Sequence, residues 1–454
     1  MSTDLIRAKH LREEGNLEAA LTIALACLDR DHEDMQALFM AAGIFIQTGR
    51  IGLAHHCMCR VLKYCPDVPE AWINYGRTLT DDEAGWKESE HAFKTALELN
   101  PDSRAAYENL GALALQQCRP DQSIGYCRKA LAADPESRVA LSTLGFAHLM
   151  RGEWEAGWKN YHVMLGHRSR PHIHYGDLPE WDGSKGRTVI VNGEQGIGDE
   201  LLYASMLPDM AKDCRHVVYD GMERLSALMS RSLPDNVYVA GQRWKDDLEL
   251  PGNIMPDARI TQAGVGMFYR RRDEDFPGTP YLKADPQIRM AMRAMLDSLG
   301  PHPKIGIAWT GGTIHSRQQF RQRTLEELTP LLRTPGVHWV SLEYKDRIDE
   351  IRAYRKSRRI DVMHLPWVTH LKEYEHTAAL VAELDLVIAV PTSVTQLAGG
   401  LGTPAWVMVP EITGWLFSHE PYVWANSVRL FRNLPVSTMV DKLQGWLNES
   451  RRAA

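Results

Sequence analysis

The sequence predicts an α-helical solenoid of repeats followed by an α/β region with two parallel sheets. Three observations support this prediction. Proline and glycine recur with a period of about 34 residues in the first third of the chain. That period stops after Gly166, and from residue 187 short apolar runs alternate with helical patterns. The 454 residues provide enough length for several domains.

The repeats are visible at Pro66, Pro101 and Pro135, each of which follows a segment with a helical ending. Proline ends a helix because it cannot continue the hydrogen-bond ladder. Glycines recur with the same spacing inside "NYGRTL", "NLGALAL" and "TLGFAHL", where a small residue lets paired helices approach closely. The pattern resembles tetratricopeptide repeats (TPRs), and we expect four to five units over residues 4–165. Such a solenoid has a groove that binds a peptide or partner, or it supports or dimerises the chain.

The remainder is expected to form a linker and two α/β domains. Residues 166–186 are rich in proline, glycine and polar residues, and we interpret them as the linker. Residues 187–300 and 301–454 each have the size of one Rossmann-like sheet. The strands "KIGIAW", "LDLVIAV" and "PAWVMV" are apolar enough to be buried on both faces. Two such sheets would face each other across a cleft, with ligands at the carboxyl ends of the strands.

The first candidate site follows the strand "RTVIVNG". Gly196 and Gly198 permit a tight turn and a close approach to the backbone, and Asp199 stands at the start of the next helix. One interpretation is that Asp199 is an N-cap, for which aspartate is a preferred residue. The other is that Asp199 is a general base held by a rigid turn. The residues alone leave both open.

The second candidate site follows the strand that ends at Trp309. Gly311 and Gly312 come next, and the cations of the loop are His315, Arg317, Arg321 and Arg323. A glycine turn beside cations suits a diphosphate. The alternative is an ordinary solvated basic loop.

The third candidate site follows the strand that ends at Val390. Thr392 and Ser393 begin a helix whose free backbone N–H groups form an anion site, and Gln396 lies one turn on. A simple helix cap by Thr392 or Ser393 is the alternative. Glu343 ends another strand, where an acid can hold ribose hydroxyls or be a surface charge.

Several motifs, in order, resemble the TPR-linked glycosyltransferases of bacteria. They are "WDG", "GEQGIGDELLYASMLP", "PYLKAD", "IGIAWTGG", "LDLVIAV", "TSVTQLAGGLGTPAWVMVP" and "SVRLFRN". The catalytic part is similar to the heptosyltransferase family (family nine), and the layout is distantly similar to protein O-GlcNAc transferases. The resemblance implies a GT-B fold of two Rossmann-like domains, with 187–300 on the acceptor side and 301–454 binding the nucleotide sugar.

The resemblance also implies the chemistry. Heptosyltransferases use an aspartate in the matching glycine turn as the base, and Asp199 occupies that position. Inverting transfer without a metal or other cofactor would follow, with the start of the Thr392–Ser393 helix and loop arginines stabilising the leaving diphosphate. The chain departs from the heptosyltransferase pattern at Pro391 and Gln396, where an acid and a histidine are typical.

Composition narrows the function classes. The net charge of −6 argues against a nucleic-acid partner, and no apolar run reaches the roughly 18 residues of a membrane helix. The charged N-terminus has no secretory pattern, and the seven cysteines suit free thiols, so we expect a cytoplasmic protein. We expect a glycosyltransferase whose repeats recognise a protein or glycan acceptor or a partner. A homo-oligomer is compatible with this expectation. A TPR scaffold with a degenerate transferase half, and a nucleotide-sugar epimerase or hydrolase, are the alternatives.

Overall fold

The computed structural model describes residues 2–161, 163, 175, 177–243, 250, 254–312, 320–369 and 373–453. The chain divides into two compact units, Met1–His148 and Leu149–Ala454. The first unit is helical, and the second is an α/β region, which confirms the order of the two predicted classes. The finer domain boundaries expected from the sequence stay predictions.

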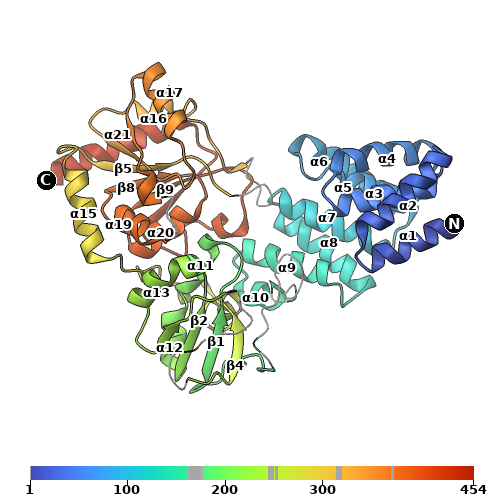
Figure 1. The fold of residues 1–454 in the computed structure, drawn as a ribbon, viewed down its shortest axis with the longest axis horizontal. Coiled ribbons are helices and arrows are strands. Elements are labelled where there is room, and N and C mark those ends of the chain that lie inside the picture. The colour runs from blue at the N-terminus through green and yellow to red at the C-terminus, as the bar shows by residue number, and fades with distance from the viewer. Residues whose placement is uncertain are drawn as a thin grey trace. The chain divides into compact units, whose positions relative to one another are not determined.

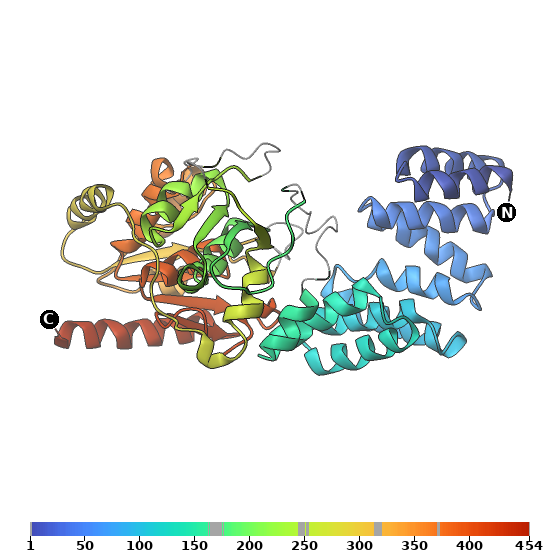
Figure 2. The same ribbon diagram turned by 90° about the horizontal axis from the view of Figure 1, so that it is seen from below.

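The helices of the repeat region form stacked antiparallel pairs (Figures 1 and 2). Their bounds are α1 (Thr3–Glu13), α2 (Leu17–Arg30), α3 (Met35–Gln47), α4 (Ile51–Tyr64), α5 (Pro69–Arg77), the 3-10 turn η1 (Glu83–Gly85), α6 (Trp86–Leu99), α7 (Arg104–Gln116), α8 (Pro120–Ala133) and α9 (Arg138–Met150).

The repeated glycines allow the close helix packing that their spacing predicts. An ideal Cβ at Gly76 would lie 2.6 Å from the ring of Phe93 on the partner helix, which is closer than carbon atoms can approach. The buried Ser89 donates a hydrogen bond to the Gly76 carbonyl at 2.9 Å. One repeat later, Ser123 donates to the Gly111 carbonyl at 2.8 Å. In two successive repeats, therefore, a serine on the second helix of the pair donates a hydrogen bond to a glycine carbonyl on the first helix.

The second unit begins with α10 (Trp154–Tyr161), which is held by an aromatic cluster. The Trp154 indole donates to Asp273 at 2.6 Å, and the Trp158 indole donates to the Arg270 carbonyl at 2.7 Å. Trp158 also meets Trp415 edge to face, with ring centroids 5.6 Å apart. Buried indole N–H groups need such partners, so α10 is an integral part of the α/β unit.

The first sheet has four parallel strands in the order β3-β2-β1-β4. The strands are β1 (Thr188–Asn192), β2 (His216–Asp220), β3 (Val237–Val239) and β4 (Ala258–Thr261). The elements that accompany them are α11 (Ile197–Ala204), α12 (Leu207–Asp213), η3 (Glu223–Leu225), α13 (Ser226–Ser232), η4 (Ala263–Val265), α14 (Gly266–Tyr269) and η5 (Asp273–Asp275). Helix α15 (Pro286–Asp297) follows and packs on α19 (Glu375–Ala382), which accompanies the second sheet (Figure 1).

The segment predicted as a linker is described only at residue 175 and from 177 on. There Trp181 is buried, with its ring centroid 4.8 Å from that of Phe268. Glu180 forms a parallel bridge with Arg259 of β4. This end of the segment therefore lies along the edge of the first sheet.

The second sheet has six parallel strands in the order β10-β9-β8-β5-β6-β7. The strands are β5 (Lys304–Ala308), β6 (His338–Ser341), β7 (Val362–Met363), β8 (Leu386–Ala389), β9 (Ala405–Val409) and β10 (Val428–Arg432). The accompanying elements are α16 (Thr329–Leu332), α17 (Ile348–Arg358), α18 (Pro366–Thr369), α19 (Glu375–Ala382), α20 (Ser393–Leu401), η8 (Trp415–Phe417) and α21 (Val436–Ala453).

The central strands of the second sheet are buried along almost their whole length. Every residue of β8 and β9 is buried, and in β5 only Lys304 is partly exposed, as their apolar sequences predict. Helix α21 completes the core, because its Met439, Leu443 and Leu447 pack into the same apolar cluster as β5 and β8.

Each sheet has one point where the strand order reverses. In the first sheet β1 lies between β2 and β4, and in the second β5 lies between β6 and β8. Crevices at such switch points, beyond the carboxyl ends of the strands, are where open α/β sheets bind ligands. The segments that leave β1, β5 and β8 there contain the predicted site residues except Glu343, which follows β6.

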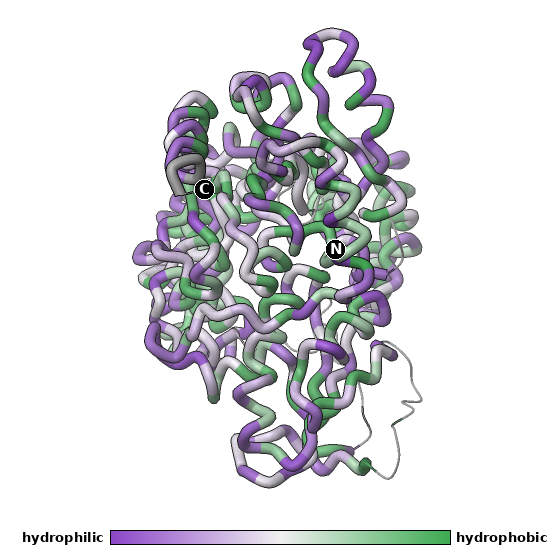
Figure 3. The backbone as a smooth tube through the Cα atoms, turned by 90° about the vertical axis from the view of Figure 1, so that its left-hand side faces the viewer, coloured by the Kyte–Doolittle hydropathy of each residue, from purple (hydrophilic) through white to green (hydrophobic). Residues whose placement is uncertain are grey.

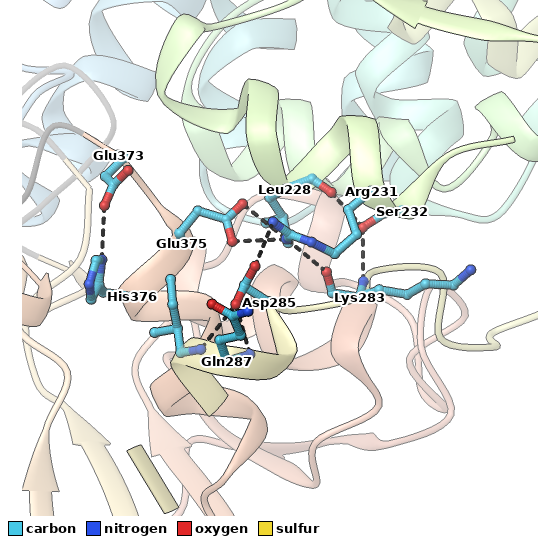
Figure 4. A network of polar contacts seen from close by, with 10 residues as sticks. Leu228, Arg231, Ser232, Lys283, Asp285, Gln287, Glu373, Glu375 and His376 are labelled. Carbon is cyan, nitrogen blue, oxygen red and sulfur yellow. Dashed lines mark hydrogen bonds and ion pairs between the residues drawn. The ribbon is translucent and has the colours of Figure 1, made fainter. Parts of the chain in front are cut away.

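A polar network ties α13 of the first sheet to α19 of the second (Figure 4). Arg231 donates to both carboxylate oxygens of Glu375, at 3.1 and 2.8 Å, and lies 3.4 Å from Asp285. The Lys283 backbone N–H donates to Ser232 at 2.8 Å. Arg231 uses Nη1 for Glu375 and Nη2 for Asp285, so one guanidinium links α13 to two acids on other elements.

Polar and apolar stretches alternate along the backbone (Figure 3). Among the described residues, no helix combines the length and apolar character that crossing a membrane requires.

Candidate functional site

The first site element is the turn from β1 to α11. Gly196 is the N-cap residue of α11, with extended backbone, and Gln195 before it has a positive φ of 62°. Asp199 is therefore the third residue of the helix and not the N-cap that the sequence suggested. Its Oδ2 still accepts a hydrogen bond from the Gly196 N–H at 3.2 Å. The carboxylate stabilises the helix start and keeps further lone pairs for other contacts.

The Asp199 side chain is half-buried, and its environment suits proton transfer. Burial raises the pKa of Asp199 to about 6, and Glu194 adds to this because it is an acid nearby. The Gly196 N–H and Arg321 act in the opposite direction. A carboxyl group with a pKa near 6 is mostly ionised at neutral pH, so its carboxylate can accept a proton. It is also a stronger base than the carboxylate of an ordinary aspartate.

The second site element is the turn from β8 to α20. Thr392 is the N-cap residue, and its backbone is extended, but its side chain accepts no hydrogen bond from the first turn of the helix. The capping role suggested for Thr392 is therefore not seen. Ser393 instead lies 3.3 Å from the Tyr374 hydroxyl, measured between the two oxygens. An uncapped helix start leaves backbone N–H groups and the positive end of the dipole for an anion.

The two turns lie against each other within the second unit, where α11 packs on α20. An ideal Cβ at Gly198 would lie 3.3 Å from Ser393 Cα and 3.6 Å from Gln396 Oε1. The glycine at 198 thus allows the turn that bears Asp199 to approach the start of α20. Gln396 is buried, and its Oε1 has no hydrogen-bond partner in the described part of the chain.

The segment after β5 joins the same place. An ideal Cβ at Gly311 would lie 2.5 Å from the Pro391 carbonyl oxygen, so this glycine packs directly on the backbone that leads into α20. Gly312 follows with a positive φ of 74°, a conformation that favours glycine. Gly198 and Gly311, from two of the candidate motifs, therefore both pack against the segment that leads into α20.

The cations of the loop after β5 are only partly described. His315 and Arg317 lie outside the described residues. Arg323 donates its backbone N–H to the Trp309 carbonyl at 2.8 Å, and its guanidinium is 3.8 Å from Glu327. The Trp309 side chain is buried in the apolar core beside the second sheet, so it packs in the core and anchors the end of β5.

Glu343 is buried and not a surface charge, which corrects one of its two sequence-based interpretations. Its Oε1 accepts the backbone N–H groups of Trp309 and Thr310, both at 2.8 Å, and Oε2 accepts the Thr310 hydroxyl. Arg347 lies 3.8 Å away. Glu343 therefore fixes the start of the glycine turn after β5, and ribose binding by it stays a prediction.

Near Asp199 the structure singles out Arg321 among the loop cations and adds Glu194 and Tyr422, which were not among the predicted binding residues. Arg321 lowers the pKa of Asp199, and Glu194, whose Oε1 accepts the Ala263 N–H at 3.1 Å, raises it. Burial raises the pKa of Tyr422 well above its usual range, and the nearby Asp199 raises it further. The Tyr422 hydroxyl has no partner that meets hydrogen-bond geometry among the described residues, although Gln396 lies close enough to interact. The sequence signals for these residues were weak. Arg321 is one of three arginines in its loop, Glu194 is an acid just before the glycine turn, and Tyr422 is a tyrosine that follows a proline.

Comparison with known proteins identifies the repeats. Residues 82–138 match the tetratricopeptide repeat family. Over 396 residues the chain is 28% identical to Protein FlbA of Caulobacter vibrioides (strain ATCC 19089 / CIP 103742 / CB 15). That match covers 81% of this chain and 64% of the relative, so the chain spans just under two thirds of the relative's length.

Solved structures resemble the helical repeats. A thermophilic TPR protein of Thermus thermophilus has 18% sequence identity and a TM-score of 0.33, covering 35% of this chain and 86% of its own. PilF of Pseudomonas aeruginosa has 17% identity and a TM-score of 0.33, covering 46% and 83%. The matched family confirms the prediction of TPRs.

Proposed function

We propose that the α/β unit is a GT-B glycosyltransferase that moves a sugar from a nucleotide-sugar donor to an acceptor hydroxyl. One observation carries the proposal. The half-buried carboxylate of Asp199, with a pKa of about 6, lies in a turn that packs against the uncapped start of α20. A base on one sheet and an anion site on the other are the two parts that this transfer needs.

The proposed step has balanced bonds and charges. The acceptor oxygen forms a bond to the anomeric carbon while its proton passes to Asp199. The bond from that carbon to the diphosphate oxygen breaks, and the nucleoside diphosphate leaves with the electron pair. The backbone N–H groups at Ser393 and the guanidinium of Arg321 stabilise the developing negative charge. Attack from the face opposite the leaving group inverts the anomeric centre, and no metal takes part.

The TPRs would present the acceptor, a protein or a glycan, or hold a partner. TPR proteins commonly bind peptides, and a repeat solenoid offers an extended surface for this. This division of labour places recognition in the repeats and chemistry at Asp199.

A thermal-shift screen tests the donor site directly. The full chain is heated with nucleoside diphosphates and nucleotide sugars in the presence of a metal chelator. A ligand at 100 times its Kd adds about 2.7 kcal/mol to stability. We expect a shift for one nucleotide family, in the wild type and in Asp199→Asn alike. The Asp441→Asn variant, which changes an exposed aspartate on α21, is the matched control.

A binding scaffold is the second candidate. Proline at 391 and glutamine at 396 replace the acid and histidine of the heptosyltransferase pattern at the start of α20. If no nucleotide shifts the melting curve, the transferase proposal fails and the scaffold is favoured. Sugar release from a donor without any acceptor would instead indicate a hydrolase or an epimerase.

A further inference from the structure

The 3-10 turn η3 of the first sheet, which contains Arg224, is held by the helix that carries Asp199. The Met222 N–H, at the start of η3, donates to Glu200 Oε2 of α11 at 2.9 Å. Glu200 is fully buried and follows Asp199 directly in α11. Leu225, the last residue of η3, is fully buried as well. The backbone at Arg224 is therefore fixed by the same helix that positions Asp199.

Tyr374, just before α19 of the second sheet, contacts both η3 and the start of α20. Its backbone N–H donates to the Arg224 carbonyl at 3.0 Å. The Arg224 guanidinium lies over the Tyr374 ring, with Cζ 5.3 Å from the ring centroid. The Tyr374 hydroxyl is 3.3 Å from Ser393 Oγ. One buried aromatic side chain therefore connects a cation of the first sheet with the start of α20.

These contacts form a closed ring that returns to α11. An ideal Cβ at Gly198 of α11 would lie 3.3 Å from Ser393 Cα, so α11 packs directly on the start of α20. From α11 the ring runs to η3, then to Tyr374 and back through Ser393. Arg224 is exposed, so a ligand can reach its guanidinium. The first sheet thus adds a positive charge to the surroundings of a helix start that already favours anions.

A purely structural cation–π contact is the simpler explanation for Arg224, but other contacts already hold Tyr374. Its backbone N–H is bonded to η3 and its side chain is buried. The acids on either side of it are engaged by other residues (Figure 4). Glu373 lies 2.9 Å from His376 Nδ1, and Glu375 accepts from Arg231 at 2.8 Å. A guanidinium over an aromatic face keeps its N–H donors along its own edge, where they match the oxygens of a phosphate.

We propose that Arg224 binds the sugar-bearing phosphate of a nucleoside diphosphate sugar whose diphosphate also lies at the start of α20. The inference rests on the proposed glycosyl transfer and extends it, because it assigns one phosphate of the donor to a residue of the first sheet. With the nucleoside on the second sheet, the phosphate next to the sugar is the one nearer to Asp199 and to η3. Arg224 would then stabilise the charge that develops on this phosphate as the sugar leaves it.

Calorimetry on the full chain with nucleoside diphosphates and the matching monophosphates tests the proposal. The probes are the adenosine, cytidine, guanosine, thymidine and uridine nucleotides, each in both forms. The ratio of the two Kd values measures the contribution of the terminal phosphate alone. For the nucleoside that binds best, we expect the wild type to prefer the diphosphate by at least about tenfold, and Arg224→Gln to lose most of that preference.

Two further variants define the role of the side chain. Arg224→Lys should retain part of the preference, because it keeps the charge and loses the two-pronged geometry. Arg215→Gln, which changes an exposed arginine just before β2, is the matched control and should behave like the wild type. Local unfolding of η3 would weaken both nucleotide forms together and leave the ratio unchanged, so the ratio separates phosphate contact from a structural role.

The outcomes distinguish this inference from the proposed function. If the wild type prefers the diphosphate and Arg224→Gln shows the same preference, the assignment of Arg224 is wrong and the donor site stands. If the wild type binds no nucleotide, or binds both forms equally, the donor site itself is contradicted and the assignment of Arg224 falls with it.

Discussion

The two strand-to-helix turns of the candidate site both have an N-cap residue with extended backbone, but they differ in the charge beside the helix start. The turn from β1 to α11 places the carboxylate of Asp199 on its own helix start, where it accepts the Gly196 N–H. In the turn from β8 to α20, Thr392 occupies the N-cap position, but its side chain makes no capping hydrogen bond. Helix starts in proteins are usually capped, so the difference is informative.

The comparison shows how one backbone arrangement supports two tasks. On α11 the N-terminal position holds an acid, and burial beside Glu194 keeps its pKa at about 6. At the start of α20 the Thr392 side chain makes no capping hydrogen bond, and there we propose that an external anion binds. Because Gly198 packs on Ser393, the two regions act on one ligand if they bind one at all. Substitutions at Asp199, Gly311, Thr392 and Arg321 each change one part of this pairing.

Removing the acid should have the largest effect. Asp199→Asn keeps the size of the side chain and an acceptor for the Gly196 N–H but removes the base. We expect turnover to fall by roughly 10²–10⁴-fold. Since the base must be ionised, wild-type turnover should rise with pH through about 6 and level off above it. Steady-state rates from pH 5 to 8 check both statements, and full activity in the variant would exclude Asp199 as the base.

Separating the loop after β5 from α20 should come next in size. Gly311→Ala would bring a methyl group to 2.5 Å from the Pro391 carbonyl, and backbone cannot give way as a side chain can. We expect a loss of about 1–3 kcal/mol in the free energy of unfolding, measured with urea. Gly445→Ala on α21 is the control, because its new methyl would meet nothing within 4 Å. That change should stabilise the protein by about 0.5–1 kcal/mol. Equal stability of the two variants would mean that Gly311 does not hold the loop in this way.

Filling the anion site should weaken nucleotide binding. Thr392→Asp supplies a carboxylate that caps α20 and occupies the positive end of its dipole. We expect at least about tenfold weaker binding of a nucleoside diphosphate by calorimetry, which is about 1.4 kcal/mol. Thr392→Asn caps the helix without a charge and should lose less. If both variants bind as tightly as the wild type, the diphosphate lies elsewhere.

Removing the arginine between the turns should have the smallest effect. Arg321 lowers the pKa of Asp199, so Arg321→Gln should raise it. The midpoint of the pH–rate profile would then move upward. A downward movement would be inconsistent with the charge arrangement.

Regular patterns made much of the fold predictable. The spacing of Gly76 and Gly111 predicted the paired helices, because each glycine contacts a side chain one helix away. The apolar runs of β5, β8 and β9 predicted central strands, since such runs are stable only when buried on both faces. The glycine turn at 196–198 indicated Asp199 because turn geometry is local.

The rest depends on contacts between distant segments. The sequence does not show that the amides of Trp309 and Thr310 donate to Glu343, so this buried carboxylate could be taken for a surface charge. Which arginine of the loop after β5 lies near Asp199 depends on how the chain returns to the strand end after the Gly311–Gly312 turn. Tyr422 follows β9 and is more distant in sequence from Asp199 than any local pattern covers, so the sequence does not show that the two residues lie close together.

The pH dependence of nucleotide binding tests most directly whether the two turns serve one ligand. Calorimetry gives the Kd of a nucleoside diphosphate from pH 5 to 8 for the wild type and for Asp199→Asn. Dividing the two Kd values at each pH removes the ionisation of the ligand itself. If the diphosphate lies at α20, ionised Asp199 repels it, so wild-type affinity should fall relative to the variant as pH rises through about 6. A ratio that stays constant over this range would contradict the account, because it would place the carboxylate and the anion out of reach of each other.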